Sequence, residues 1–241
     1  MSTLVAFTRS LLFYVIYVTI LTFFGTFACS FGMFLPCRAR HNVVTLANAL
    51  IVKWLNVSCG ITLRIDGLKN VPKTPCVILS KHQSGWETFY LQRLLRPVST
   101  ILKKELFWIP FFGWALYFMH PIAINRSNPR EALKQILSQG LQRLASGKNV
   151  LIYPEGTRLP LGEIGRYGRS GAALAIAAGV QIIPISHNAG YCWPARAFIK
   201  RPGQIHISIG EPIETNSGDD SRLLMEHVKN VIESTQKTLK H

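Results

Sequence analysis

Residues 76–87 read CVILSKHQSGWE. The apolar run from Cys76 to Leu79 is typical of a short buried β-strand, and the polar residues after it are typical of a loop at a strand's end. Gly85 offers permissive backbone and Ser84 is a suitable helix cap, so this loop can lead into a helix. The stretch therefore predicts a strand–loop–helix unit whose polar side chains gather at the carboxyl end of the strand.

Six further apolar runs of similar length lie on either side of this unit, and amphipathic segments separate several of them. They predict strands over residues 61–65, 98–102, 122–124, 150–153, 181–185 and 205–209. Apolar residues at helical spacing predict packing helices over residues 130–146 and 221–239. We therefore expect one α/β domain over residues 61–241, with a largely buried sheet of about seven strands flanked by helices.

The first 60 residues differ from this domain, because they are apolar and contain no acidic side chain. Leu11 to Pro36 is a run of 26 uncharged residues, which as a helix would reach about 39 Å and could cross a hydrocarbon core of about 30 Å. A second apolar segment, residues 43–61, is interrupted by Asn48, Lys53 and Asn56. Residues 1–60 are therefore predicted to be a helical membrane-association segment, which either spans the bilayer or lies in its interface. The long run suits a retained segment better than a cleaved signal peptide.

The charge balance also favours a membrane surface. The chain has 27 Lys and Arg against 12 Asp and Glu, a formal net charge of +15, and it has no groove-reading motif that would indicate a nucleic-acid partner. Arg9 precedes the apolar run, whereas Arg38 and Arg40 follow it, which favours a cytoplasmic main domain. Five cysteines without a paired or metal-like spacing fit reduced thiols. We expect the inner (cytoplasmic) membrane, with the main domain facing the cytoplasm.

His82 and Glu87 are the first candidate reactive residues. A histidine oriented by a carboxylate can take a proton from an alcohol near neutral pH. In a continuous helix, positions five apart differ by about 140° around the axis, so the two side chains can meet only if the chain bends between them. The residues alone leave two readings open, which are a catalytic pair and an ordinary polar turn before a helix.

Polar residues also follow three other predicted strands. They are Lys103 with Lys104, Asn125 with Arg126, and Glu155 to Arg158. Ligands of open α/β sheets bind beyond the carboxyl ends of the strands, so these groups are expected to share one cleft with His82. The turn from Glu155 to Arg158 can offer backbone donors and a guanidinium to a phosphate, or it can be held by an internal Glu155–Arg158 pair.

Four blocks of these residues resemble a known family. HQSGWE (residues 82–87) resembles the HX4D block of the glycerolipid acyltransferases, AINR (123–126) their second block, YPEGTR (153–158) their EGTR block, and QIIPI (181–185) their proline-containing fourth block. The segment KKELFWIPFFGW (103–114) is similar to the corresponding segment of 1-acylglycerol-3-phosphate acyltransferases. The resemblance covers about residues 63–210 and implies the mixed, helix-flanked sheet of that family.

This resemblance implies transfer of a fatty acyl group from acyl-CoA or acyl carrier protein to the sn-2 hydroxyl of 1-acylglycerol 3-phosphate, giving phosphatidate. It implies that His82 is the general base and that Glu87 holds it, without a metal or redox cofactor. The residues that it implies for substrate binding are Lys103, Asn125, Arg126, Glu155, Gly156, Thr157, Arg158 and Pro184, with Pro184 shaping the acyl-donor side. Another lysophospholipid, glycerol 3-phosphate or a lyso-aminolipid remain alternative acceptors, and a noncatalytic anionic-lipid-binding protein is the alternative of another class.

Two residues depart from the family pattern, since Glu87 and Asn125 stand where aspartate is usual. The longer Glu87 must reach His82 through a shifted helix start, and Asn125 removes a charge near the expected anion site. The aromatic residues between Trp108 and Phe118 could line an acyl tunnel, rest in the membrane interface or pack in the core.

Overall fold

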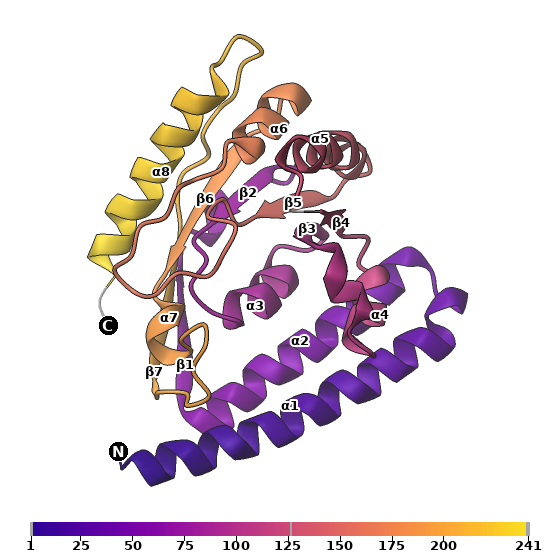
Figure 1. The fold of residues 1–241 in the computed structure, drawn as a ribbon, viewed down its shortest axis with the longest axis vertical. Coiled ribbons are helices and arrows are strands. Elements are labelled where there is room, and N and C mark those ends of the chain that lie inside the picture. The colour runs from indigo at the N-terminus through magenta and orange to yellow at the C-terminus, as the bar shows by residue number, and fades with distance from the viewer. Residues whose placement is uncertain (1, 126, 240–241) are drawn as a thin grey trace.

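Seven strands form one mixed sheet in the order β1-β7-β6-β2-β5-β3-β4 (Figure 1). The structure is a computed structural model that describes residues 2–125 and 127–239, with the backbone alone at Met33, Cys37 and Arg38. The strands are β1 (Ile61–Asp66), β2 (Val77–Ser80), β3 (Val98–Lys103), β4 (Ile122–Ile124), β5 (Asn149–Ile152), β6 (Ile182–His187) and β7 (Gly203–Ile209). All neighbouring strands are parallel except β6 and β7.

The seven predicted strands are confirmed, with ends that shift by one or two residues. Their composition explains their places in the sheet: β2 and β6 are buried along their whole length, as expected for parallel strands covered on both faces. In β7 only Ile205, Ile207 and Ile209 are buried, in the alternating pattern of a half-covered strand. Because β2, β5, β3 and β4 are adjacent and parallel, their carboxyl ends lie along one edge of the sheet.

Helices cover both faces of the sheet (Figure 1). One face carries α5 (Pro129–Ala145), α6 (Ser170–Ala178) and α8 (Ser221–Thr238), and the other carries α3 (Trp86–Leu94) with two long N-terminal helices. The two predicted packing helices correspond to α5 and α8. Each face has its own apolar core: Ile136, Leu174 and Val228 belong to the first, and Trp86 and Leu91 to the second.

The N-terminal helices α1 (Thr3–Phe31) and α2 (Cys37–Cys59) run antiparallel beneath α3 (Figure 1). Both are long and apolar enough to cross a membrane by length and composition. They also pack on the α/β domain: Phe13 of α1 is fully buried, with its ring 5.2 Å from that of Trp193. The hairpin thus shares the core of the α3 face, and Gly60, in left-handed conformation with φ of 69°, joins it to β1.

Three shorter helices complete the site region. The 3-10 helix η3 (Lys104–Trp108) and α4 (Phe112–Tyr117) follow β3 and contact one another, and α4 lies beside α1. Gly25 of α1 allows this approach, because a Cβ there would lie 2.6 Å from the carbonyl oxygen of Phe111. The short helix α7 (Ala189–Cys192) connects β6 to the segment that contains Trp193.

Candidate active site

His82 and Glu87 are in direct contact at the carboxyl end of β2. The Nδ1 atom of His82 lies 2.8 Å from Glu87 Oε1, and Glu87 is completely buried. The same oxygen accepts hydrogen bonds from the N–H groups of Gln83 (3.0 Å) and Ser84 (2.8 Å). An imidazole whose Nδ1–H donates to this carboxylate has its lone pair on Nε2, so it can accept a proton there.

The charge of Glu87 is stabilised although it is buried. Burial alone raises its pKa, but the hydrogen bond from His82, the neighbouring imidazole of His187 and the Ser84 N–H outweigh this effect, so the pKa lies below its ordinary value. Glu87 is therefore a carboxylate at neutral pH, and it can stabilise an imidazolium at His82.

The bend that brings the pair together is produced by the start of α3. Ser84 Oγ accepts a hydrogen bond from Trp86 N–H at 3.1 Å, while the N-cap position is Gly85, one residue later than expected. Gly85 has an ordinary right-handed backbone (φ −78°, ψ −24°), so the bend does not require the wider conformational freedom of glycine. Its small size has a packing reason instead, because a Cβ would lie 3.3 Å from the Trp193 ring.

Tyr153 covers one face of the His82 ring. The two rings stack with centroids 4.1 Å apart and an interplanar angle of 19°. Burial, with the nearby Glu87 carboxylate, raises the pKa of Tyr153 well above its ordinary value, so the phenol stays protonated. Tyr153 is not among the site residues expected from the sequence, and its position directly after β5 is the signal that could have indicated it.

The loop after β5 holds the main chain of His82 at both ends. Glu155 Oε2 accepts a hydrogen bond from His82 N–H (2.9 Å), and Leu159 N–H donates one to the His82 carbonyl oxygen (2.9 Å). The other oxygen of Glu155 accepts from Lys81 Nζ (2.7 Å). Both Glu155 oxygens are thus engaged in the interior, whereas Arg158 is exposed, so an internal Glu155–Arg158 pair is not what holds this turn.

The pair opens into a cleft of about 550 Å³. The expected site residues that line it are His82, Lys103, Gly156, Thr157 and Arg158. Gly156 has φ of 69°, a left-handed conformation that favours glycine and allows the turn. Arg196 is a third cation in the lining and was not expected from the sequence. It does not directly follow a strand, so its position in the sequence gave no indication of a site.

Three of the expected binding residues, Asn125, Glu155 and Pro184, lie outside this lining, and Arg126 lies outside the described residues. Asn125 follows β4, three strand spacings or about 14 Å from β2, and its Oδ1 accepts hydrogen bonds from Ser127 N–H and Oγ. Pro184 lies within β6 opposite Leu79, and its carbonyl oxygen accepts from Gly210 N–H. Glu87 and Glu155 lie behind the cleft and support residues that line it.

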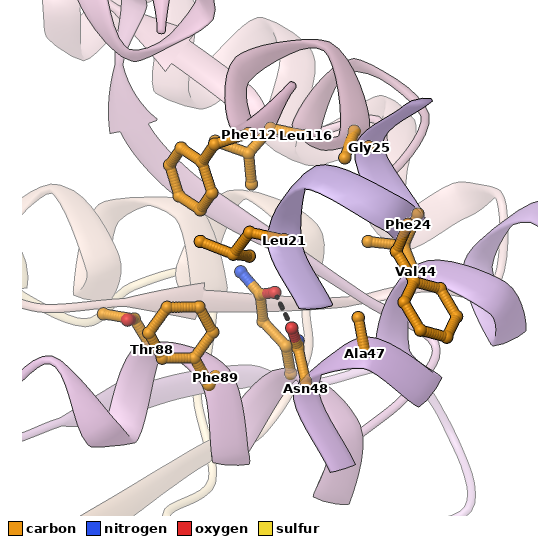
Figure 2. Close-up of a pocket in the computed structure, with 12 residues that line it drawn as sticks. Leu21, Phe24, Gly25, Val44, Ala47, Asn48, Thr88, Phe89, Phe112 and Leu116 are labelled. Atoms are coloured by element: carbon orange, nitrogen blue, oxygen red, sulfur yellow. Dashed lines mark hydrogen bonds between the residues drawn. The ribbon is translucent and has the colours of Figure 1, made fainter. Parts of the chain in front are cut away.

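A small apolar recess lies next to the cleft, between α1, α2, α3 and α4 (Figure 2). Leu21 and Phe112 extend toward one another across it, and a hydrogen bond of 3.2 Å joins Asn48 to Gln92 at one side. Cleft and recess share the lining residues Thr88, Phe89, Gln92, Phe112 and Leu116. Among the aromatic residues of segment 108–118, Phe112 thus lines the recess, whereas Trp108, Trp114 and Tyr117 are exposed.

No group of three or more His, Cys, Asp and Glu side chains suited to a metal ion occurs within residues 2–125 and 127–239. The chemistry that the described side chains offer is proton transfer at His82 beside a cationic binding region. A cleft with these groups can activate a hydroxyl on a molecule that also carries an anionic group.

This fold and site define an acyltransferase, and the family model described as Acyltransferase matches residues 62–188. More narrowly, the chain belongs to the 1-acyl-sn-glycerol-3-phosphate acyltransferases. It is 46% identical over 219 residues to the protein of that name from Pseudomonas aeruginosa, which covers 90% of this chain and 85% of the relative. It is 31% identical to the chloroplastic enzyme BAT2 of Brassica napus, over 70% of this chain but only 49% of that longer relative.

A solved structure has the same fold. The crystal structure of the 1-acyl-sn-glycerophosphate acyltransferase PlsC from Thermotoga maritima superposes with a TM-score of 0.82, at 22% identity. The match covers 99% of this chain and 97% of that one, so it includes the N-terminal hairpin as well as the α/β domain.

Proposed function

We propose that this protein transfers a fatty acyl group from acyl-CoA or acyl carrier protein to the sn-2 hydroxyl of 1-acylglycerol 3-phosphate, giving phosphatidate. The observation that carries the proposal is the 2.8 Å contact between His82 Nδ1 and Glu87 Oε1 at a cleft that Lys103 and Arg158 also line. A base and cations in one cleft suit an acceptor that carries both a hydroxyl and a phosphate.

In this reaction, His82 Nε2 takes the proton of the acceptor hydroxyl as its oxygen attacks the carbonyl carbon of the thioester. The Glu87 carboxylate stabilises the imidazolium that forms and keeps the ring in the required tautomer. The tetrahedral adduct then collapses with cleavage of the carbon–sulfur bond, and the imidazolium returns the proton to the leaving thiolate. The products are the new ester and a free thiol. Neither an acyl-enzyme nor a metal or redox cofactor is needed for this sequence.

The acceptor phosphate is assigned to the turn at Gly156 to Arg158, with Lys103 assisting. A guanidinium can bind phosphate oxygens in a bidentate manner, and a lysine adds a point charge. The apolar recess of Figure 2 is suited to the end of an acyl chain that lies in the adjoining cleft, since Leu21, Phe24, Phe89 and Phe112 contribute to its lining. Pro184 lies within β6 and is assigned an indirect role, in which it shapes this strand rather than contacting the substrate.

The membrane association of the enzyme is assigned to the α1–α2 hairpin lying in the interface. Large apolar side chains along α1 are exposed, among them Leu12, Val15 and Phe23, and such a surface suits insertion at the headgroup boundary. Withdrawal of α1 into a separate spanning helix would expose Phe13 and its partner Trp193. On these grounds, with Arg38 and Arg40 beyond the first helix, we assign the enzyme to the cytoplasmic face of the inner membrane.

A panel of acceptors and donors tests this function. Purified protein is mixed with lysophosphatidate, another lysophospholipid, glycerol 3-phosphate or monoacylglycerol, and with acyl-CoA or acylated carrier protein, and both thiol release and lipid product are measured. Phosphatidate formation is expected to dominate and to be lost in His82→Ala but not in His227→Ala, which changes an exposed histidine of α8. A folded His82→Ala with full activity would refute the mechanism, and vesicle binding without thioester consumption would favour a noncatalytic lipid-binding protein.

A further inference from the structure

A buried lysine stands directly before His82. Lys81 is 1% exposed, and its ammonium lies between Glu155 Oε1 (2.7 Å) and Glu233 Oε1 (2.8 Å). It also donates to the carbonyl oxygen of Glu163 at 3.1 Å. Its three acceptors match the three N–H donors of an ammonium group, so Lys81 links the end of β2, the loop after β5 and the C-terminal helix α8.

Glu233 is held in place from a second side. The hydroxyl of Tyr167 donates to the same Glu233 oxygen at 2.7 Å, and Ser186 of β6 donates to the carbonyl oxygen of the preceding residue Ile232 at 2.9 Å. The main chain of Lys81 is equally fixed, because its N–H donates to Ile185 O (3.0 Å) and its carbonyl oxygen accepts from His187 Nε2 (2.9 Å). The ammonium therefore connects two anchored points.

Fold stability alone does not account for such a cluster, because a buried charged group loses its hydration and well-packed apolar residues often stabilise a core equally well. The hydrogen bonds suggest another role. Glu155 uses one oxygen for Lys81 and the other for His82 N–H, and Leu159 binds the His82 carbonyl oxygen. Residues 156–158, which line the cleft, lie between these two attachment points.

We propose that Lys81 and Glu233 are positioning residues that lock the loop of residues 155–159 to the main chain of His82. This inference rests on the proposed function, in which His82 is the base and the loop binds the acceptor phosphate. In one acceptor molecule the phosphate and the reacting hydroxyl are separated by a fixed number of bonds. The distance between loop and base therefore decides whether the hydroxyl reaches Nε2, and small misplacements of that kind are costly to the rate.

The primary test is Glu233→Gln, which keeps an oxygen acceptor for Lys81 and Tyr167 but removes the charge. We expect an acceptor KM higher by about threefold and a kcat lower by about tenfold, since a charge-assisted hydrogen bond is roughly twice as strong as a neutral one. The donor KM is expected to stay unchanged, because the donor does not depend on the phosphate loop. Lys81→Met, which leaves two buried carboxylates without their cation, is expected to lose about 10²-fold in kcat.

Two variants of the same helix serve as controls. Glu226→Gln makes the same chemical change at an exposed position of α8, and Val228→Ala weakens the buried packing of α8 without touching the cluster. Both are expected to keep the acceptor KM of the parent protein, measured well below their unfolding temperatures. If Val228→Ala raised the acceptor KM as much as Glu233→Gln, a general packing role would replace the positioning role.

A double-mutant cycle with Arg158→Ala separates positioning from plain stabilisation. Once Arg158 no longer holds the phosphate, the placement of the loop matters less, so Glu233→Gln is expected to cost less than in the parent protein. Additive effects on kcat/KM would overturn the proposal.

Failure of the proposed function would be recognised separately. In that case the parent protein would not acylate lysophosphatidate. Hydrogen–deuterium exchange would still test whether Lys81 and Glu233 hold the loop of residues 155–159 to the main chain of His82. Exchange in residues 80–84 and 155–159 is expected to be faster in Glu233→Gln than in Glu226→Gln. Equal exchange in both would overturn the lock independently of any activity.

Discussion

Glu87 concentrates three hydrogen bonds on one carboxylate oxygen, from His82 Nδ1 and from two N–H groups of the loop. The longer side chain that replaces the usual aspartate is accommodated because Glu87 lies in the first turn of α3, from where it reaches back to the loop. Glu87 thus holds the main chain of the loop around His82, in addition to orienting the imidazole ring.

Substitution of Glu87 is expected to affect kcat more than binding. Glu87→Gln removes the charge that stabilises the imidazolium and permits the wrong tautomer, so we expect kcat to fall by about 10³- to 10⁴-fold. Glu87→Asp stays ionised but is shorter, and an intermediate loss is expected. Steady-state kinetics with both substrates varied would measure this, with Glu226→Gln as the control. An unchanged kcat in a folded Glu87→Gln would contradict the role of Glu87.

At the scale of elements, α1 is fastened to the segment after α7 by Lys200. The ammonium of this buried lysine donates to Tyr14 Oη and to the carbonyl oxygen of Phe198, both at 2.8 Å, and it lies 4.8 Å from the centre of the Trp193 ring. The backbone N–H of Lys200 donates a hydrogen bond to Ser10 Oγ at 2.8 Å. The N-terminal half of α1 is therefore attached to the same segment that contributes Trp193 and Arg196 to the cleft.

The attachment predicts a dependence of stability on pH. Burial lowers the pKa of Lys200 to about 8, whereas an unfolded chain has a lysine pKa of about 10.4. Between these values the unfolded state binds more protons, so this group's contribution to stability is largest above about pH 10.4 and is lost as the pH falls through about 8. We expect the unfolding temperature of the parent protein to rise relative to that of Lys200→Met between pH 8 and pH 10. Parallel curves in a thermal melt series would contradict this assignment.

The contact between α1 and α4 predicts a second element-scale effect. A Cβ at Gly25 would meet backbone and Cβ atoms of Phe111 at 2.6–2.8 Å, and the backbone cannot yield as a flexible side chain can. Gly25→Ala is therefore expected to destabilise the protein by about 1–3 kcal/mol and to narrow the recess of Figure 2, which Gly25 lines. Denaturant unfolding would measure the loss. Gly218→Ala, where a Cβ meets nothing within 4 Å, is expected to change little, and equal effects at both positions would contradict the close approach.

At the scale of the whole molecule, the site lies at the junction of the sheet edge and the N-terminal hairpin. The strand ends supply His82, Lys103 and the loop of residues 155–159, while Tyr14 and Tyr17 of α1 complete the cleft lining. The recess continues from the cleft toward α1 and α2. A hairpin that lies in the membrane interface would place the cleft beside the lipid from which an acceptor enters.

This arrangement predicts that α1 controls membrane binding. Val15 and Phe23 are 56% and 64% exposed on α1, and Val15→Glu with Phe23→Glu is expected to release the protein from vesicles that contain phosphatidylglycerol. Leu223→Glu, at an equally exposed apolar position of α8 (59%), is the matched control and is expected to keep binding. Co-sedimentation measures this, and added salt should weaken the contribution of the +15 charge. Equal release by both changes would contradict an interface on α1.

The local pattern of apolar and polar residues was sufficient to predict the strands and two of the flanking helices, α5 and α8. Apolar runs such as residues 77–79 and 182–185 are continuous because both faces of their strands are buried. The apolar residues of α5 and α8 recur at helical spacing because only one face of each helix is buried. The helices α6 and α7 were not predicted, since α6 is apolar all round and α7 has only four residues. The ordered blocks also indicated the acyltransferase family, because each block keeps its residues together in the sequence.

Only the tertiary structure decided which polar residues share the cleft. Strand order separates Asn125, which follows β4, from His82, which follows β2, although both lie just beyond the carboxyl end of a strand. The partnership of Lys81 with Glu155 and Glu233 joins residues 74 and 152 positions apart, and the sequence holds no local signal for it. Spacing along a chain determines secondary structure because that depends on near neighbours, whereas the meeting of distant side chains depends on how the strands are ordered and the helices packed.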